Sequence, residues 1–442
     1  MSVWTSPPSC SRAAPSDRSS GWRPWRTAGR SSTRNTPIGS ASNLSRRPCS
    51  NNSGGAVYAP AVTTANAEPA DGGQVRVSTL ELFFDLVFVF TITQLTHVFT
   101  HDPGWRALGQ VAVLFGVIWW MYSGYVWLTN EVAPSNSARR TWLLIGMFAF
   151  FVLALSIPDA FHGSGIPFGL AYILVTVIHT LLFASGGGES ATIAIKRIAP
   201  LNALAALLVL AGGFADGWLQ YLCWTAAFAV QVISPYLVET RDFQVRAAHF
   251  AERHGLVIIV AIGESVVAIG VGLAGQSITV PLVAQVALGL SLAYVLWWAY
   301  FGIDDERGEH ALAAVPVRER STPAVLAYGY SLYPMLIGIV VTAAGINLSI
   351  AHGNQPTSLA AAAALSGGVT LYFLGQFAFR LSLRLSRPWS RLAAAVAVAA
   401  TIPIGVAWVA WGQLVALVAV AYAAVIADDL VALRAGQHSS YV

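Results

Sequence analysis

The chain has 442 residues, of which 55% are hydrophobic and only 10% are charged, and its formal net charge is +4. A soluble globular domain carries about 25% charged residues, so most of the surface of this protein has to face lipid. The composition excludes a basic, aromatic surface for nucleic acid, and three unevenly spaced cysteines indicate neither a disulfide framework nor a metal site. We therefore expect a lipid bilayer as partner, no nucleic acid and no cofactor.

Residues 1–73 are rich in Ser, Pro, Arg and Gly and contain no long apolar run. They lack the apolar core of a signal peptide. We predict a disordered N-terminal tail. A mis-assigned start codon would give the same pattern.

From Leu80 onward, apolar stretches recur with short polar breaks between them. Each is about 20 residues long, the length that crosses a hydrocarbon core of roughly 30 Å. We predict an all-α, multi-pass membrane protein with about twelve transmembrane helices. The predicted spans cover roughly residues 77–99, 106–128, 141–157, 167–185, 197–213, 217–236, 254–274, 279–301, 324–346, 358–379, 391–408 and 411–430.

The loops predict the orientation of these spans. Alternate loops, taken together with both termini, hold every basic residue except Arg106. Cytoplasmic loops of membrane proteins carry an excess of Lys and Arg. We therefore expect both termini in the cytoplasm and the protein in the cell membrane.

The second half of the predicted spans repeats sequence features of the first half. Three matches occur in order: Asp85 with Glu264, Trp119-Trp120-Met121-Tyr122 with Trp297-Trp298-Ala299-Tyr300, and Trp218-Leu219-Gln220 with Trp411-Gly412-Gln413. They predict two tandem six-helix halves, 74–242 and 243–436, followed by a short cytoplasmic tail, 437–442. An even number of spans per half relates the halves by a pseudo-twofold axis along the membrane normal, as in parallel-repeat transporters.

Acidic residues inside spans are the main candidates for function. Glu81 and Asp85 are four residues apart and share one helical face, and Glu264 lies about ten residues into the seventh predicted span. A charged side chain at mid-bilayer costs about 2.5–3.5 kcal/mol, so such residues tend to face a bundle interior or water. We expect these three carboxyls to form an ion or proton pathway, with support from Thr93, Gln94, His249, Glu252, Arg253, His254 and Ser265. Alternatively, protonated carboxyls, or Glu81 and Asp85 paired with Arg76 or Arg253, only hold helices together.

Other polar positions carry weaker signals. Asp159 and His162 form an Asp-x-x-His pair and His101-Asp102 lies in another loop, but no third ligand has diagnostic spacing, so no metal site is predicted. His179 is the only histidine in its predicted span, and we interpret it as a hydrogen-bonded core residue. We interpret the acidic run Asp304-Asp305-Glu306 as a solvated loop. The pairs Trp119-Trp120 and Trp297-Trp298 are interpreted as parts of an aromatic belt at the membrane surface.

Two blocks resemble the low temperature requirement protein A family. The first is Leu80-Glu81-Leu82-Phe83-Phe84-Asp85-Leu86-Val87-Phe88-Val89 followed by Thr91-Ile92-Thr93-Gln94-Leu95, and the second is His249-Phe250-Ala251-Glu252-Arg253-His254-Gly255 leading to Ile262-Gly263-Glu264-Ser265. The similarity covers roughly residues 75–435 and implies a bacterial multi-pass membrane protein associated with growth in the cold. A looser similarity links Phe83-Phe84-Asp85 to the first helices of tandem six-helix endolysosomal cation channels, whose first helices line a pore. The second half lacks both phenylalanines, so this likeness is analogy.

Three functions stay open from the sequence. The first is a transporter or channel for protons or small cations that uses the acidic residues of spans one and seven. The second is a membrane-embedded or lipid-modifying enzyme that uses His249, Glu252, Arg253 and His254 at the cytoplasmic interface, although no catalytic motif assigns a catalytic residue. The third is a non-catalytic membrane component for growth in the cold. A homo-oligomer is compatible with all three.

Overall fold

The computed structural model describes residues 78–434 except 133–135, 187, 239–242, 274, 276 and 353–354. The predicted tails 1–73 and 437–442 lie outside the described residues. Within the described part every regular element is helical. The first six helices are α1 (Thr79–His101), α2 (Trp105–Glu131), α3 (Ser137–Leu155), α4 (Gly165–Gly186), α5 (Glu189–Phe214) and α6 (Trp218–Leu237).

The remaining helices include several short or irregular pieces. They are α7 (Ala247–Gly272), α8 (Val280–Phe301), α9 (Asp304–Ala313), the 3₁₀ turn η1 (Val317–Glu319), α10 (Ser321–Ala324), the π-helix η2 (Val325–Ser331), α11 (Leu332–His352), α12 (Leu359–Ser382), α13 (Pro388–Ala399), α14 (Ile402–Ala407) and α15 (Ala410–Arg434). Segments α10, η2 and α11 follow one another without a break, and α13 and α14 together form one long element.

Eleven helical segments in the described residues are long and apolar enough to cross a bilayer. The remaining predicted span, 217–236, corresponds to α6, a 20-residue helix that packs beside α5 and α2. It is long enough to span, but Gln220 and Gln231 reduce its apolar character, and both side chains are buried against other helices. The prediction of an all-α, multi-pass membrane protein is therefore confirmed.

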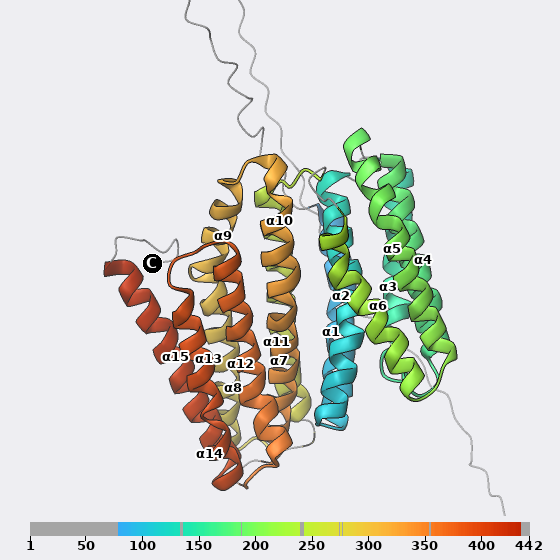
Figure 1. Ribbon diagram of the computed structural model, residues 1–442. Coiled ribbons are helices and arrows are strands. Elements are labelled where there is room, and N and C mark those ends of the chain that lie inside the picture. The colour runs from blue at the N-terminus through green and yellow to red at the C-terminus, as the bar shows by residue number, and fades with distance from the viewer. Residues whose placement is uncertain are drawn as a thin grey trace, which may run out of the picture. The chain divides into compact units, whose positions relative to one another are not determined.

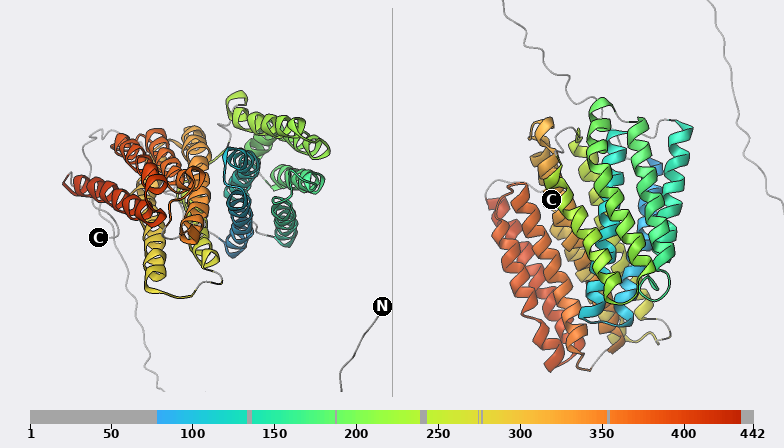
Figure 2. Two further views of the ribbon diagram at one scale, coloured as in Figure 1. Left: turned by 90° about the horizontal axis from the view of Figure 1, so that it is seen from below. Right: turned by 45° about the vertical axis from the view of Figure 1, so that its right-hand side comes forward.

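The helices form two neighbouring groups, α1–α6 and α7–α15 (Figures 1 and 2). Helices that occupy corresponding places in the two groups pack against corresponding neighbours. In the first group α1 contacts α2 and α3, α3 contacts α4, α4 contacts α5, and α6 contacts α5 and α2. In the second group α7 contacts α8 and α11, α11 contacts α12, α12 contacts α13, and α15 contacts α13 and α8.

The two groups meet through α1 and α2. Both of these helices pack against α7 and against α11. In the end-on view of Figure 2, α1 and α2 (blue) lie on the side of the first group that faces the second. The α1–α7 interface therefore lies inside the bundle, away from most of the lipid-facing surface.

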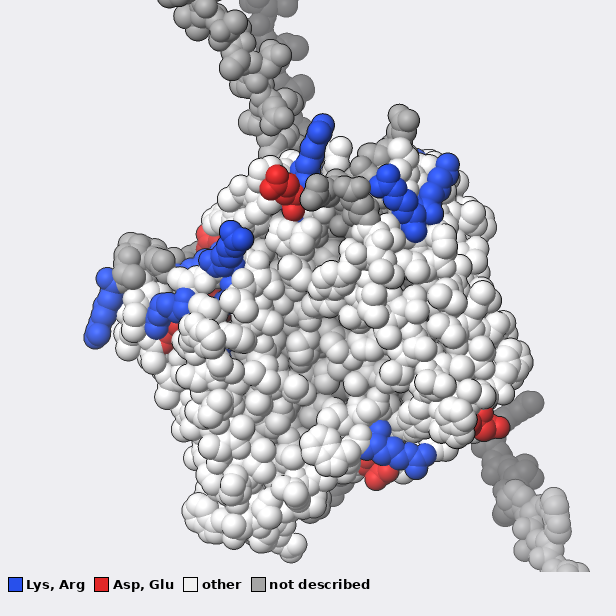
Figure 3. Space-filling view, in the orientation of Figure 1, with Lys and Arg blue, Asp and Glu red and all other residues white. Residues whose placement is uncertain are grey.

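The outside of the bundle suits a bilayer. Large apolar side chains such as Leu86, Phe148, Leu207 and Val267 are exposed. On the face drawn in Figure 3, Lys and Arg gather mainly at the end that holds α9 and α10, and the flank below is almost free of charge. An uncharged apolar flank between polar ends is what a hydrocarbon core selects.

Candidate functional site

The site begins at the N-terminus of α1, where Glu81 has two partners. The hydroxyl of Ser78 accepts a hydrogen bond from the Glu81 backbone N–H, and Glu81 Oε2 accepts one from the Ser78 backbone N–H at 2.8 Å. This reciprocal capping box satisfies two of the free N–H groups at the helix start. The other oxygen, Oε1, lies 3.3 Å from Nε2 of His249 on α7. Glu81 therefore starts one helix and contacts another.

One helical turn further along α1, Asp85 binds two groups. Its Oδ1 lies 3.0 Å from an Nη of Arg253 and accepts a 2.5 Å hydrogen bond from the Tyr122 hydroxyl on α2. The Arg253 side chain has no exposed surface, and that of Asp85 is 4% exposed. Phe84 stacks on Tyr122 and Tyr125 beside this group. The charges are thus enclosed by aromatic rings, where an unpaired charge would be costly.

Helices α1 and α7 pair in register over this region. The carboxyls of Glu81 and Asp85 are four residues apart, and so are their partners His249 and Arg253. Side chains four apart lie on one face of a helix, so two parallel helices present matching acidic and basic faces. The contact between Arg253 and Asp85 is one of the pairings that the structural alternative named, in which the ion pair only holds helices together.

Glu264 lies at a different depth from Asp85. Helix α7 begins at Ala247, seven residues before the predicted span, and Glu264 lies just beyond the middle of the helix. Its Oε2 accepts a 2.6 Å hydrogen bond from the hydroxyl of Thr93, eight residues beyond Asp85 on α1. At 1.5 Å per residue that separation is about 12 Å along the helix. Glu264 therefore meets α1 about two helical turns beyond Asp85.

Buried hydroxyls without partners line the same two helices. Thr91, Thr96 and Ser265 are buried, and their hydroxyls make no hydrogen bond with any described residue. Thr96 follows Asp85 by eleven residues, and Glu264 follows Arg253 by eleven. Eleven residues bring a helix back to within about 20° of the same direction. Polar groups therefore continue along both faces beyond the Asp85–Arg253 pair.

The supporting residues do not all converge here. His254 is buried and its Nδ1 lies 2.8 Å from the backbone carbonyl oxygen of Phe250, whereas Glu252 is exposed. Gln94 is half-buried. The predicted cluster of His249, Glu252, Arg253 and His254 is thus split, because neighbouring helical residues point in different directions.

A second buried ion cluster, which was not predicted from the sequence, lies in the α7–α15 group. Arg380 on α12 lies 2.8 Å from Asp304 and 2.7 Å from Asp428, and Arg391 lies 3.6 Å and 3.5 Å from the same carboxylates. The expectation that Asp304 lies in a solvated loop is wrong, since it begins α9 and is fully buried. Asp428 lies inside predicted span 411–430, so the rule that selected Asp85 also selects it.

The Trp-Trp pairs and the outer acidic and histidine residues lie as follows. Trp119 is completely buried and its Nε1–H donates to the Gly329 carbonyl, so it does not belong to an aromatic belt. His101, Asp102, Asp159 and His162 border one pocket at the ends of α1 and α3. No group of three His, Cys, Asp or Glu residues in the described chain is arranged to hold a metal ion.

These features define a multi-pass α-helical membrane protein whose two helix groups are joined through buried ionisable side chains. Over residues 76–426 the sequence matches the family described as bacterial low temperature requirement A protein (LtrA), and the chain belongs to that family. It is 28% identical over 316 residues to an uncharacterized protein of Rhizobium meliloti (strain 1021), a match that covers 68% of this chain and 76% of the relative. The predicted family resemblance is confirmed.

Proposed function

We propose that this LtrA-family protein moves protons across the membrane along the α1–α7 interface. The observation that carries the proposal is the line of buried ionisable and hydroxyl groups from Glu81 to Glu264 inside an otherwise apolar bundle. Keeping such groups within the membrane is expensive, and buried ionisable residues are a common means of relaying protons there.

The first section of the pathway is the paired group at the start of α1. Glu81 and His249 are both groups that take up and release protons, and Asp85 is next along the same face. The Tyr122 hydroxyl donates to Asp85, so it is positioned to adjust when that carboxyl changes charge. A proton entering at Glu81 therefore has acceptors within one helical turn.

The second section depends on groups that lack partners. Nδ1 of His249, two nitrogens of Arg253 and the Thr96 hydroxyl are buried and make no hydrogen bond with the described residues. Buried polar atoms in proteins are normally paired with protein or water. His249 and Arg253 lie level with Glu81 and Asp85, and Thr96 lies beyond Thr93, so ordered water would have to bridge the roughly 12 Å between Asp85 and the Thr93–Glu264 pair. A purely structural ion pair has no need of such a line.

A proton fits this arrangement better than a hydrated cation. Arg253 places a positive charge beside Asp85 at the centre of the line, which repels a metal cation. A proton needs only successive hydrogen bonds, whereas a hydrated ion needs a pore. The small pocket beside Glu81 and Arg253 is lined mainly by apolar side chains such as Phe84, Leu143 and Met147, which also disfavours a hydrated ion.

The lipid-modifying enzyme has less support. That reading needs His249, Glu252 and Arg253 to share an open site, but Glu252 is exposed while the other two are buried against α1. A non-catalytic membrane component would keep the ion pairs and carry no flux. A measurement of proton flux therefore distinguishes a proton transporter from a non-catalytic membrane component.

The orientation and the duplication belong to the same proposal. The basic end of the bundle, which includes α9 and α10, suits the cytoplasm by the positive-inside rule. The repeated pattern of helix pairs supports an origin from two tandem six-helix halves. With this orientation, Glu81 lies at the cytoplasmic end of the pathway and Glu264 lies toward the outside.

The test is a proton-flux assay in liposomes. Protein reconstituted with an internal pH-sensitive dye is subjected to a K⁺ diffusion potential set by valinomycin. We expect faster internal pH change than in empty liposomes, and about a tenfold or greater loss of that flux in Glu264→Gln, because the amide cannot relay a proton. Sodium and potassium fluxes are measured in parallel.

The matched control is Glu252→Gln, the same chemical change on an exposed residue of the same helix. It should leave flux near the wild-type value. Wild-type liposomes that acidify no faster than empty ones would overturn the proposal. Equal flux in Glu264→Gln and wild type would remove Glu264 from the pathway.

A further inference from the structure

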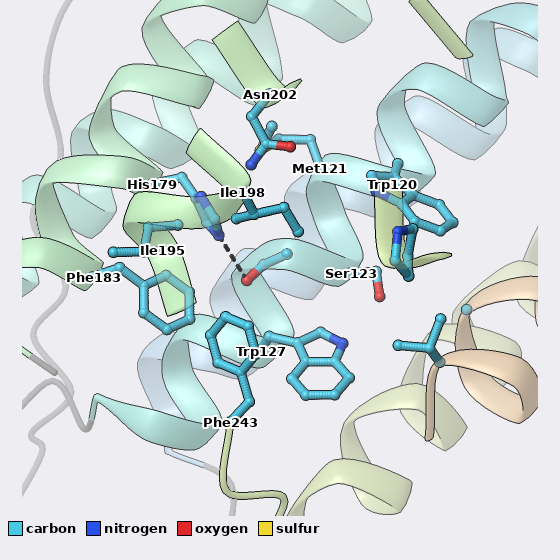
Figure 4. Close-up of a pocket in the computed structure, with 14 residues that line it drawn as sticks. Trp120, Met121, Ser123, Trp127, His179, Phe183, Ile195, Ile198, Asn202 and Phe243 are labelled. Atoms are coloured by element: carbon cyan, nitrogen blue, oxygen red, sulfur yellow. Dashed lines mark hydrogen bonds between the residues drawn. The ribbon is translucent and has the colours of Figure 1, made fainter. Parts of the chain in front are cut away.

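The chamber drawn in Figure 4 lies among α2, α4, α5, α6 and the π-helix η2. Apolar and aromatic side chains form most of its wall, and none of its lining residues is Asp, Glu, Lys or Arg. His179 is buried here, and its Nε2 lies 3.0 Å from the carbonyl oxygen of Gly124, shown by the dashed line. This chamber therefore offers no charged group to water, in contrast to the pocket at the end of α1.

A larger pocket, which we call the outer pocket, lies where α1 turns into α2 at the lower end of Figure 1. Its walls come from the last turns of α1, the first turns of α2 and the loop between α3 and α4. Its volume is about 1220 Å³, including the space at its mouth. Six of its twelve lining residues are ionisable, namely His97, His101, Asp102, Arg106, Asp159 and His162. A pocket of this size and polarity has both room and hydrogen-bonding partners for water.

His97 connects the outer pocket to the α1–α7 interface. One helical turn before it on α1, the Thr93 hydroxyl donates the 2.6 Å hydrogen bond to Glu264. Residues four apart on a helix differ in direction by about 40°, and their Cβ atoms are about 6 Å apart. Helical side chains also lean toward the N-terminus of the helix, so that of His97 leans back over the turn that holds Thr93. His97 is therefore the next ionisable group along α1 between Glu264 and the outer pocket.

The same spacing recurs one turn further along α1. His101 follows His97 by four residues, and the centroids of the two imidazole rings are 6.5 Å apart. Exposure to water increases in the same direction, since Glu264 is 3% exposed, Thr93 is half-buried, and His97 and His101 are both exposed. A proton path that ends in water needs this passage from buried to exposed groups, and histidine exchanges protons near neutral pH.

Charged groups from several elements share the outer pocket with His97. Asp102 follows α1, Asp159 lies in the loop between α3 and α4, and Arg106 belongs to the first turn of α2. With neutral histidines, two carboxylates and one guanidinium give these lining residues a formal charge of −1. A negative pocket attracts protons and raises their local concentration.

We propose that His97 is the outer proton-exchange residue of the α1–α7 pathway and passes protons between the water of the outer pocket and Glu264. This role rests on the proton pathway proposed above. In the inward direction, one ring nitrogen takes a proton from water, and the other gives its proton to the Glu264 carboxylate through the Thr93 hydroxyl or a water molecule. The ring keeps its charge and ends as the other tautomer, and proton exchange with water restores the first.

The liposome flux assay tests this role on the full-length variants His97→Gln and His97→Ala. Both should lose about tenfold or more of the wild-type proton flux, because neither side chain exchanges protons. Imidazole, equilibrated across the membrane before the potential is applied, should restore at least half of the lost flux in His97→Ala. Empty liposomes with the same imidazole give the background. A histidine that only shaped the end of α1 would not be replaced by free imidazole.

The matched control is His310→Gln, the same chemical change on an exposed histidine of α9, which should leave the flux near the wild-type value. Normal flux in His97→Gln, together with lost flux in Glu264→Gln, would overturn the role of His97 and leave the pathway standing. Lost flux in His97→Ala that imidazole does not restore would also overturn it. Wild-type flux no greater than that of empty liposomes would overturn the pathway itself and the role of His97 with it.

Discussion

The guanidinium of Arg253 lies 3.0 Å from the carboxylate of Asp85, and the two side chains join α7 to α1 with almost no exposed surface. One belongs to the first predicted half of the chain and the other to the second. The pair is therefore a link between the two helix groups as well as a member of the proposed pathway. These two roles are separable by measuring stability and flux on the same variants.

Breaking this pair from one side should be more damaging than removing both charges. We expect Asp85→Asn or Arg253→Gln alone to lower the free energy of unfolding by about 3–5 kcal/mol, because each leaves a buried charge without its partner. The double variant should lose clearly less than the sum of the two single losses. Unfolding in mixed detergent micelles measures all four proteins. Additive losses would show that the two side chains do not stabilise each other.

The second ion cluster predicts a strong asymmetry between neighbouring acidic residues. Asp304 is fully buried between Arg380 and Arg391, whereas Glu306, two residues later, is exposed. We expect Asp304→Asn to cost about 3–5 kcal/mol and Glu306→Gln less than about 1 kcal/mol. Thermal unfolding followed by size-exclusion chromatography provides the comparison. Similar midpoints for both variants would contradict the buried cluster.

Close packing of α11 against α12 predicts different effects at two adjacent glycines. A Cβ on Gly368 would lie 2.6 Å from the backbone nitrogen of Thr342, while a Cβ on Gly367 would meet nothing within 4 Å. Gly368→Ala should therefore destabilise the protein by about 1–3 kcal/mol through overpacking. Gly367→Ala should be neutral or slightly stabilising, since alanine favours a helix more than glycine does. The same unfolding assay measures both, and a loss at Gly367 equal to that at Gly368 would be inconsistent with this interface.

The sequence alone was sufficient for the class of protein. Runs of about 20 apolar residues require helices in a bilayer, because a bare backbone in lipid has to bond to itself. The same reasoning selected Glu81, Asp85 and Glu264, since a carboxyl inside an apolar run is conspicuous without any structure. It also suggested Arg253 as a partner for an acidic residue of the first span. The family blocks added membership of the LtrA family.

Only the tertiary structure decided which of these groups meet. The match of Asp85 with Glu264 in the sequence did not give the register between α1 and α7, in which Asp85 meets Arg253 and Glu264 meets Thr93. Likewise, the sequence around Asp304 predicts a loop, whereas in the structure Arg380 and Arg391 from distant helices enclose this carboxylate. Helical period fixes the face on which a side chain lies, whereas the register between two helices depends on contacts far apart in the chain. The sequence pattern does not encode that register in any local form.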